Sequence, residues 1–235
     1  MKRKYLLLLI VVLMSCKAKY NIDKENIYPS PDIVIPYHSN WTKKHYLQKI
    51  KEFEAKPLSV GDIVFIGNSI TENGGNWGKR FNNPKIKNRG ISGDVTDGVL
   101  NRLGEIYYYK PTAVFLKIGI NDIFNDNLSP EYIGNNILKI VQNIKKYSPK
   151  TTIYVQTIIP TSTEKIVAKI QSTNIILKTN SKKYKYILID LHTIFADKND
   201  LMLKEYTVDG VHLNEAGYSL WVDFIKNYLI ETKNP

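Results

Sequence analysis

The sequence predicts one α/β domain built as three layers, with helices on both faces of a parallel sheet. Short apolar runs rich in β-branched residues alternate with longer amphipathic stretches along most of the 235 residues. This alternation is typical of parallel strands joined by crossover helices. Hydrophobic residues make up 43% of the chain and charged residues 23%, a balance that supports one sizeable core and argues against disorder.

The beginning of the chain is typical of a signal peptide. Basic residues at positions 2–4 precede an apolar run at positions 6–14. This run is much shorter than the roughly 20 residues that a transmembrane helix needs. Residues 1–15 are therefore interpreted as a cleaved leader.

Cys16 follows this leader directly and is the single cysteine, so no internal disulfide is possible. A short apolar run followed at once by cysteine resembles the lipobox of bacterial lipoproteins. That resemblance implies acylation of Cys16, a lipid anchor in a membrane, and a place in the bacterial cell envelope, facing outside the cytoplasm. The alternative is an unmodified cysteine behind an ordinary signal peptide.

Residues 16–40 are expected to form the lipidated cysteine and a tether. Positions 17–37 contain three of the ten prolines and show little periodicity. The domain is expected over residues 41–235. Apolar residues recur at helical spacing from Trp41 to Glu54, which predicts a first helix that ends before Pro57.

The rest of the pattern predicts five strands and four further helices. Apolar, β-branched-rich runs predict strands at 62–66, 113–118, 152–158 and 186–189, with a weaker strand at 85–88. Amphipathic stretches predict helices at about 95–107, 130–147, 164–183 and 214–229. Reactive groups in open α/β sheets gather in the loops beyond the carboxyl ends of the strands, so polar residues there are the candidates for a site.

Ser69 is the candidate nucleophile. The first predicted strand runs directly into Gly67-Asn68-Ser69-Ile70-Thr71, which places the serine at a strand-to-helix turn. The following helix N-terminus can supply N–H donors and the positive end of a dipole. A serine there can equally be a helix N-cap, and Thr71 stands where the Gly-x-Ser-x-Gly elbow of α/β-hydrolases has its last glycine.

Asp209 and His212 are the candidate acid and base. They lie three residues apart in the loop before the last predicted helix. A serine needs a base to take its proton, and a carboxylate holds that base in the right tautomer. The alternative is a turn aspartate beside a surface histidine. Among the other histidines, only His192 is a credible competitor, because His38 and His45 precede the α/β body; the histidine spacing predicts no metal site.

Gly93 and Asn121 are candidate donors to a developing oxyanion. Gly93 follows the weak second strand and could offer its backbone N–H, with Asp94 as the cap of the next helix. Asn121 follows the third strand, in Gly119-Ile120-Asn121-Asp122, and could point its side-chain amide into the same crevice. Each could also be an ordinary turn residue.

These four blocks, in this order, resemble the SGNH (GDSL-like) hydrolase family. The resemblance implies a flavodoxin-like fold with a five-stranded parallel sheet, and no cofactor. It implies that Ser69 is the nucleophile, that His212 is the base and that Asp209 orients it. The backbone N–H groups of Ser69 and Gly93 and the Asn121 amide would then form the oxyanion hole. One departure is Asn68, which stands where the family usually has aspartate.

Residues 88–100 are similar to the branch with platelet-activating-factor acetylhydrolase-like enzymes and bacterial carbohydrate acetylesterases. The resemblance implies a serine esterase that removes acetyl or other short acyl groups from carbohydrate or glycan esters at the cell envelope. One alternative is a lysophospholipase or short-chain phospholipid esterase, and another is a noncatalytic glycan-binding lipoprotein. Trp77 could border the site or pack under the first helix.

The formal net charge is +11, of which three positive charges belong to the leader. The lysines are scattered, without a nucleic-acid motif or a basic face interleaved with aromatic residues, so no nucleic-acid partner is predicted. Solvated helix faces explain them most simply, and attraction to acidic glycans or anionic lipid headgroups is the alternative. Nothing in the sequence predicts the oligomeric state.

Overall fold

The computed structural model describes residues 23–231 and contains a five-stranded parallel sheet. The strands lie in the order β2-β1-β3-β4-β5, which is the strand order of flavodoxin-like sheets. Their bounds are Ile63–Gly67 (β1), Ile86–Gly90 (β2), Ala113–Lys117 (β3), Thr152–Gln156 (β4) and Ile187–Ile189 (β5).

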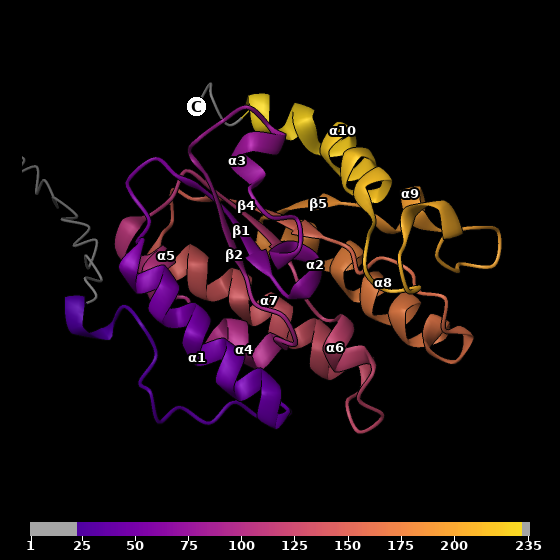
Figure 1. Cartoon of the computed structure of the whole chain (residues 1–235), viewed down its shortest axis with the longest axis horizontal. Helices are drawn as coiled ribbons and strands as arrows, with labels where there is room; N and C mark the ends of the chain where they lie inside the picture. Colours follow the sequence, from indigo (N-terminus) through magenta and orange to yellow (C-terminus); the bar gives the residue numbers. More distant parts are fainter. Residues whose placement is uncertain (1–22, 232–235) are drawn as a thin grey trace, which may run out of the picture.

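Helices cover both faces of this sheet. Figure 1 shows α1, α4, α5 and α7 on one side, and α3 and α10 on the other. The predicted three-layer α/β/α fold is therefore confirmed. The helix bounds are Asn40–Ala55 (α1), Ser69–Glu72 (α2), Trp77–Arg80 (α3), Thr96–Leu100 (α4), Gly104–Tyr109 (α5), Ile120–Ile123 (α6), Pro130–Tyr147 (α7), Val167–Tyr184 (α8), His192–Phe195 (α9) and Glu215–Glu231 (α10), with short 3-10 turns at Lys24–Asn26, Glu164–Ile166 and Lys204–Tyr206.

One predicted helix is two helices in the structure. The range 95–107 contains α4 and α5, separated at residues 101–103. The side-chain amide of Asn101 donates to the carbonyl of Asp97 at 2.8 Å and so competes with the helical ladder at the end of α4. The chain therefore changes direction within a segment whose apolar pattern is continuous.

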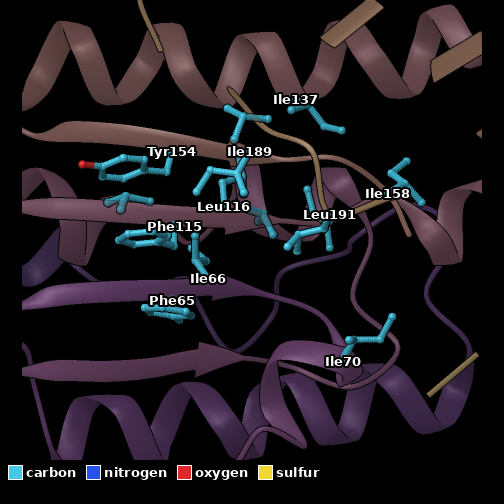
Figure 2. Close-up of a cluster of buried hydrophobic side chains, with 14 of the residues drawn as sticks. Phe65, Ile66, Ile70, Phe115, Leu116, Ile137, Tyr154, Ile158, Ile189 and Leu191 are labelled. Atoms are coloured by element: carbon cyan, nitrogen blue, oxygen red, sulfur yellow. The ribbon is translucent and has the colours of Figure 1, made fainter. Parts of the chain in front are cut away.

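Aromatic rings tie three neighbouring strands together in the core. Phe65, Phe115 and Tyr154 are register partners on β1, β3 and β4, and Figure 2 shows their rings one beside the next. The ring centroids are 4.8 Å apart for Phe65 and Phe115, and 4.3 Å apart for Phe115 and Tyr154. Offset stacking of this kind adds about 0.5–1.5 kcal/mol per pair to the gain from burial.

Trp77 belongs to the same core. Its side chain is fully buried and stacks on Phe65, and its ring also lies 4.7 Å from that of Trp221 on α10. Its indole N–H donates to the carbonyl of Thr71 at 2.9 Å. Trp77 therefore neither borders the site nor packs under the first helix, and both expectations for it are wrong.

The N-terminal segment is packed against the domain over much of the range predicted as a tether. Ile27 and Ile35 are buried, and Ile35 belongs to an apolar cluster with Tyr46 and Ile50 of α1. The packed body therefore begins before Trp41, where the sequence placed its start. Such a segment has no helical or strand period, so periodicity could not reveal its packing.

The predicted leader at 1–15 and Cys16 lie outside the described residues. Within residues 23–231, no helix combines the length and the apolar character that crossing a membrane requires.

Candidate active site

Ser69 lies where the first strand meets a helix. It is the first residue of α2, directly beyond β1 and the N-cap residue Asn68, whose side-chain oxygen accepts from the N–H of Ile70 at 3.2 Å. Gly67 keeps this turn tight, because a Cβ atom there would lie 2.1 Å from the carbonyl oxygen of Lys117 on the neighbouring strand. The backbone of β1 thus presents Ser69 at the carboxyl edge of the sheet.

Ser69, His212 and Asp209 form one chain of hydrogen bonds. The Ser69 hydroxyl oxygen is 2.9 Å from Nε2 of His212, although the two residues are 143 positions apart. Nδ1 of the same imidazole is 2.7 Å from a carboxylate oxygen of Asp209. An ionised carboxylate only accepts, so Nδ1 carries the proton and Nε2 is free to accept one from Ser69.

The Asp209 carboxylate is held in its ionised form. Partial burial acts to raise the pKa of Asp209, but the hydrogen bonds from the His212 ring and from the backbone N–H groups of His212 and Val211 outweigh it and lower that pKa to about 2. The carboxylate therefore remains charged at neutral pH and fixes the tautomer of His212.

Thr207 stabilises the loop that carries Asp209 and His212. This role of Thr207 was not predicted from the sequence. Its hydroxyl donates to the carbonyl of His212 at 2.7 Å and accepts from the N–H of Gly210 at 2.9 Å. Gly210 itself has φ +84°, a conformation that favours glycine. The loop is thereby closed on itself, and the only sequence signal for it is a threonine two residues before the aspartate.

Gly93 and Asn121 lie beyond the neighbouring strands, β2 and β3. Gly93 has φ +78°, and a Cβ atom there would lie 2.5 Å from the hydroxyl oxygen of Thr42 on α1. Among residues 23–231, no hydrogen-bond acceptor is paired with the backbone N–H of Gly93. The Asn121 amide donates to the carbonyl of Asp94 at 2.8 Å, so it is fixed beside the loop that contains Gly93.

Asp94 does not cap the following helix, contrary to the expectation. It is fully buried, and its carboxylate lies 2.9 Å from Nε of Arg102 and 3.0 Å from Nε2 of His38. The carboxylate of Asp122 instead accepts from the N–H and the hydroxyl of Thr96, the first residue of α4. The buried ion pair between Asp94 and Arg102 therefore anchors the loop that contains Gly93.

His192 has a carboxylate partner that the sequence did not reveal. Its Nε2 is 3.1 Å from Asp200, and its Nδ1 is 3.0 Å from the carbonyl of Ile158. Both ring nitrogens thus have partners of their own, and among the described residues neither is hydrogen-bonded to a serine hydroxyl. In the part of the chain that the structure describes, no group of three or more His, Cys, Asp or Glu side chains is placed to hold a metal ion.

The model of the GDSL-like lipase/acylhydrolase family matches residues 65–220, two thirds of the chain. The chain belongs to the GDSL-like lipase/acylhydrolase family. In this GDSL-like chain, the residue before Ser69 is Asn68, and its buried side-chain nitrogen has no hydrogen-bond partner among the described residues.

Solved structures share the fold of this GDSL-like protein. One is a protein from Streptococcus pneumonia described as a platelet activating factor, at a TM-score of 0.71 and 29% identity, covering 81% of this chain and 95% of that one. Another is a variant of an acetyl-xylooligosaccharide esterase from Geobacillus Stearmophilus, at a TM-score of 0.58 and 19% identity, covering 77% and 97% of the two chains.

One curated relative is an N-acylneuraminate cytidylyltransferase from Escherichia coli O18:K1:H7. It is 28% identical over 180 residues, which are 74% of this chain and 40% of that protein. The chain thus spans about two fifths of the length of the curated relative it matches.

Proposed function

We propose that this protein is a serine esterase that removes acetyl or other short acyl groups from carbohydrate or glycan esters. The observation that carries the proposal is the chain of hydrogen bonds from Ser69 through His212 to Asp209, at 2.9 Å and 2.7 Å. A serine is a weak nucleophile on its own, and this arrangement provides the base and the carboxylate that activate it.

The first half of the reaction forms an acyl-enzyme. Ser69 attacks the ester carbonyl while His212 takes the hydroxyl proton, and the carbonyl oxygen becomes an oxyanion. The tetrahedral intermediate then collapses, the bond to the alcohol oxygen breaks, and the imidazolium gives its proton to the departing alcohol. Asp209 stabilises the imidazolium between these two steps.

The second half consumes one water molecule. His212 takes a proton from the water as its oxygen attacks the acyl-enzyme, and then returns the proton to the Ser69 oxygen as the carboxylic acid departs. In both halves, the backbone N–H groups of Ser69 and Gly93 and the Asn121 amide are the proposed donors to the oxyanion. Preorganised donors of this kind typically account for about 10²–10³-fold in rate each.

The substrate class rests on the surface position of the site and on a neighbour in fold. The side chains of His212 and Asp209 are 33% and 50% exposed, which favours a bulky alcohol reaching an open site over a long acyl chain threaded into a tunnel. An acetyl-xylooligosaccharide esterase shares the fold, which supports a carbohydrate as that alcohol.

Acyl-chain profiling of the full-length protein tests the function. We expect hydrolysis of 4-nitrophenyl acetate and of acetylated xylo-oligosaccharides, falling off as the acyl chain lengthens, and lost in Ser69→Ala. Ser59→Ala, which changes an exposed serine before the amino end of β1 while Ser69 lies beyond its carboxyl end, is the matched control. A preference for long chains would favour a phospholipid substrate, and equal activity in wild type and Ser69→Ala would favour a binding protein.

The place of action is a separate part of the proposal. Acylation of Cys16 would hold the enzyme on a membrane of the bacterial cell envelope, facing outside the cytoplasm. Mass spectrometry of the native N-terminus should find cleavage before Cys16 and a mass increase from fatty acyl groups. Detection of an unmodified Cys16, or of cleavage at another position, would remove the anchor from the proposal.

A further inference from the structure

The first turns of α1 form a wall beside the loop that carries Gly93. Thr42 contacts Gly93 so closely that a methyl group on the glycine would lie 2.5 Å from the threonine oxygen. Just before the helix, Nε2 of His38 is 3.0 Å from Asp94, the residue after Gly93. The segment that carries Trp41 therefore contacts the loop with Gly93 through His38 and Thr42.

Trp41 projects from this wall and keeps its ring open to solvent. It is 59% exposed, whereas Trp77 and Trp221, the other two tryptophans, are fully buried. The indole is nonetheless held in place, because it stacks on the His45 ring with 4.8 Å between centroids and 15° between planes. One face of the indole is thus packed on the protein and the other face is available.

His45 is itself anchored to the catalytic region. Its Nε2 lies 2.9 Å from Glu72, the last residue of α2, the helix that begins with Ser69. The same Glu72 carboxylate accepts from the hydroxyl of Ser92 at 2.7 Å and from its N–H. Since a helix rises about 1.5 Å per residue, Glu72 is only one turn from the nucleophile.

The Glu72 carboxylate already has several hydrogen-bonding and charged partners in this cluster. Burial acts to raise its pKa, but the hydrogen bonds from Ser92 and His45 outweigh burial and lower that pKa. Lys49 adds a positive charge 3.7 Å from the carboxylate. The negative charge next to the stacked rings is therefore already balanced.

We infer that the stacked rings of Trp41 and His45 form a subsite for a sugar ring of the substrate's alcohol portion; this rests on the proposed esterase function. One face of a pyranose presents several C–H bonds, and their partly positive hydrogens suit the negative face of an aromatic ring. The hydroxyl groups at the sugar's rim stay in water, as the open setting of Trp41 allows. Placed there, the sugar stacks on a ring that is tied through His45 and Glu72 to the helix that begins with Ser69.

The same aromatic face could instead attract a quaternary ammonium group. The structure favours the sugar, because Glu72 is already paired with His45 and Lys49 and leaves no free carboxylate to draw a cation. A second exposed aromatic side chain, Tyr37, lies four residues before Trp41 and edge-on to Tyr132, with 6.3 Å between the ring centroids.

Kinetics of the full-length enzyme test the subsite. The measured quantity is the ratio of kcat/KM for acetylated xylo-oligosaccharides to kcat/KM for ethyl acetate, an ester without a ring. In Trp41→Ala this ratio should fall by about twofold to tenfold, the range expected for one aromatic stacking contact. Trp41→Phe should recover part of it, and Phe224→Ala, which removes an exposed ring from α10, should leave the ratio at the wild-type value.

A binding measurement makes the test independent of turnover. In a Ser69→Ala background, acetylated xylo-oligosaccharide should protect tryptophan fluorescence from acrylamide, because Trp41 is the exposed tryptophan. The protection should disappear in Ser69→Ala/Trp41→Phe.

The outcomes separate the two proposals. Sugar-ester hydrolysis with a ratio unchanged in Trp41→Ala would overturn the subsite alone. Cleavage of ethyl acetate without cleavage of any acetylated sugar would overturn the glycan substrate and the subsite together. A larger effect of Trp41→Ala on acetylcholine than on the sugar esters would replace the sugar with a cation.

Discussion

Asn121 donates from its side-chain amide to the backbone carbonyl of Asp94, with 2.8 Å between the two atoms. The bond uses one of the two amide hydrogens and orients the other without help from a substrate. It also ties the end of β3 to the loop after β2, so two of the proposed oxyanion donors are fixed relative to each other. Such preorganisation is what makes a donor effective in a transition state.

Removing this amide should slow the chemical step. We expect Asn121→Ala to lower kcat for a short acetate ester by about 10²–10³-fold, with little change in KM. Asn127→Ala, at an exposed position of the same loop region, should behave as wild type. A defect seen only in KM would mean that Asn121 binds the substrate and does not stabilise the oxyanion.

Gly93 should not tolerate a side chain. Its φ of +78° disfavours other residues, and an added Cβ would press on Thr42. Gly93→Ala should lower the free energy of unfolding by about 1–3 kcal/mol through backbone strain and crowding. In a Thr42→Ala background the cost should be smaller but still present, because only the crowding is relieved. Urea unfolding of the two single variants and the double variant measures this, and strictly additive costs would contradict the contact.

The two histidines beyond the sheet should differ sharply in their effect on activity. His212→Ala should lower kcat by on the order of 10⁴-fold or more, because the serine loses its base. His192→Gln should keep a rate close to that of wild type, since both nitrogens of His192 face acceptors of its own, Asp200 and the Ile158 carbonyl. Ester hydrolysis by both variants, with circular dichroism to check folding, decides the assignment. A larger loss in the His192 variant would reverse it.

The sheet and its long helices could be predicted because their signals are local. The central strands β1 and β3 are buried along their whole length, and apart from Lys117 at the end of β3 each is an unbroken apolar run. Helix α7 has the predicted bounds, 130–147, because Ser129 caps its N-terminus and Pro130 occupies its first turn. Local hydrogen bonding also explains why the prediction of one helix over 95–107 was wrong. The side chain of Asn101 bonds to Asp97 at the end of α4, within a continuous apolar pattern.

The residues of the candidate site likewise divide into those with a local sequence signal and those without one. Ser69, Gly93, Asn121 and His212 could be found because each stands at the junction of a strand or loop with a helix. Their supports could not be found, because Asp94 is paired with His38 across 56 positions. No periodic or spacing signal connects such residues, so the contacts of His38 and Thr42 with the loop that carries Gly93 are found only in the folded chain.

Lys117 provides a test of the fold that is independent of catalysis. It ends β3 with its side chain only 2% exposed, and its amino group lies 5.8 Å from the centre of the Trp221 ring. Burial lowers the pKa of Lys117 to about 7, because the charged form loses its hydration there. In the unfolded chain the same amine should have its ordinary pKa of about 10.4.

Stability should therefore rise with pH over this interval. Between about pH 7 and pH 10 the unfolded chain binds a proton at Lys117 that the folded chain lacks, so the free energy of unfolding gains up to ~1.4 kcal/mol per pH unit from this group. Lys117→Met keeps much of the side-chain volume and removes the titration, so it should be more stable than wild type at pH 7 and lose the advantage towards pH 10. Urea unfolding of both proteins at pH 7, 8 and 9 measures the difference in slope. Parallel pH profiles would show that the amine is not buried in an uncharged form.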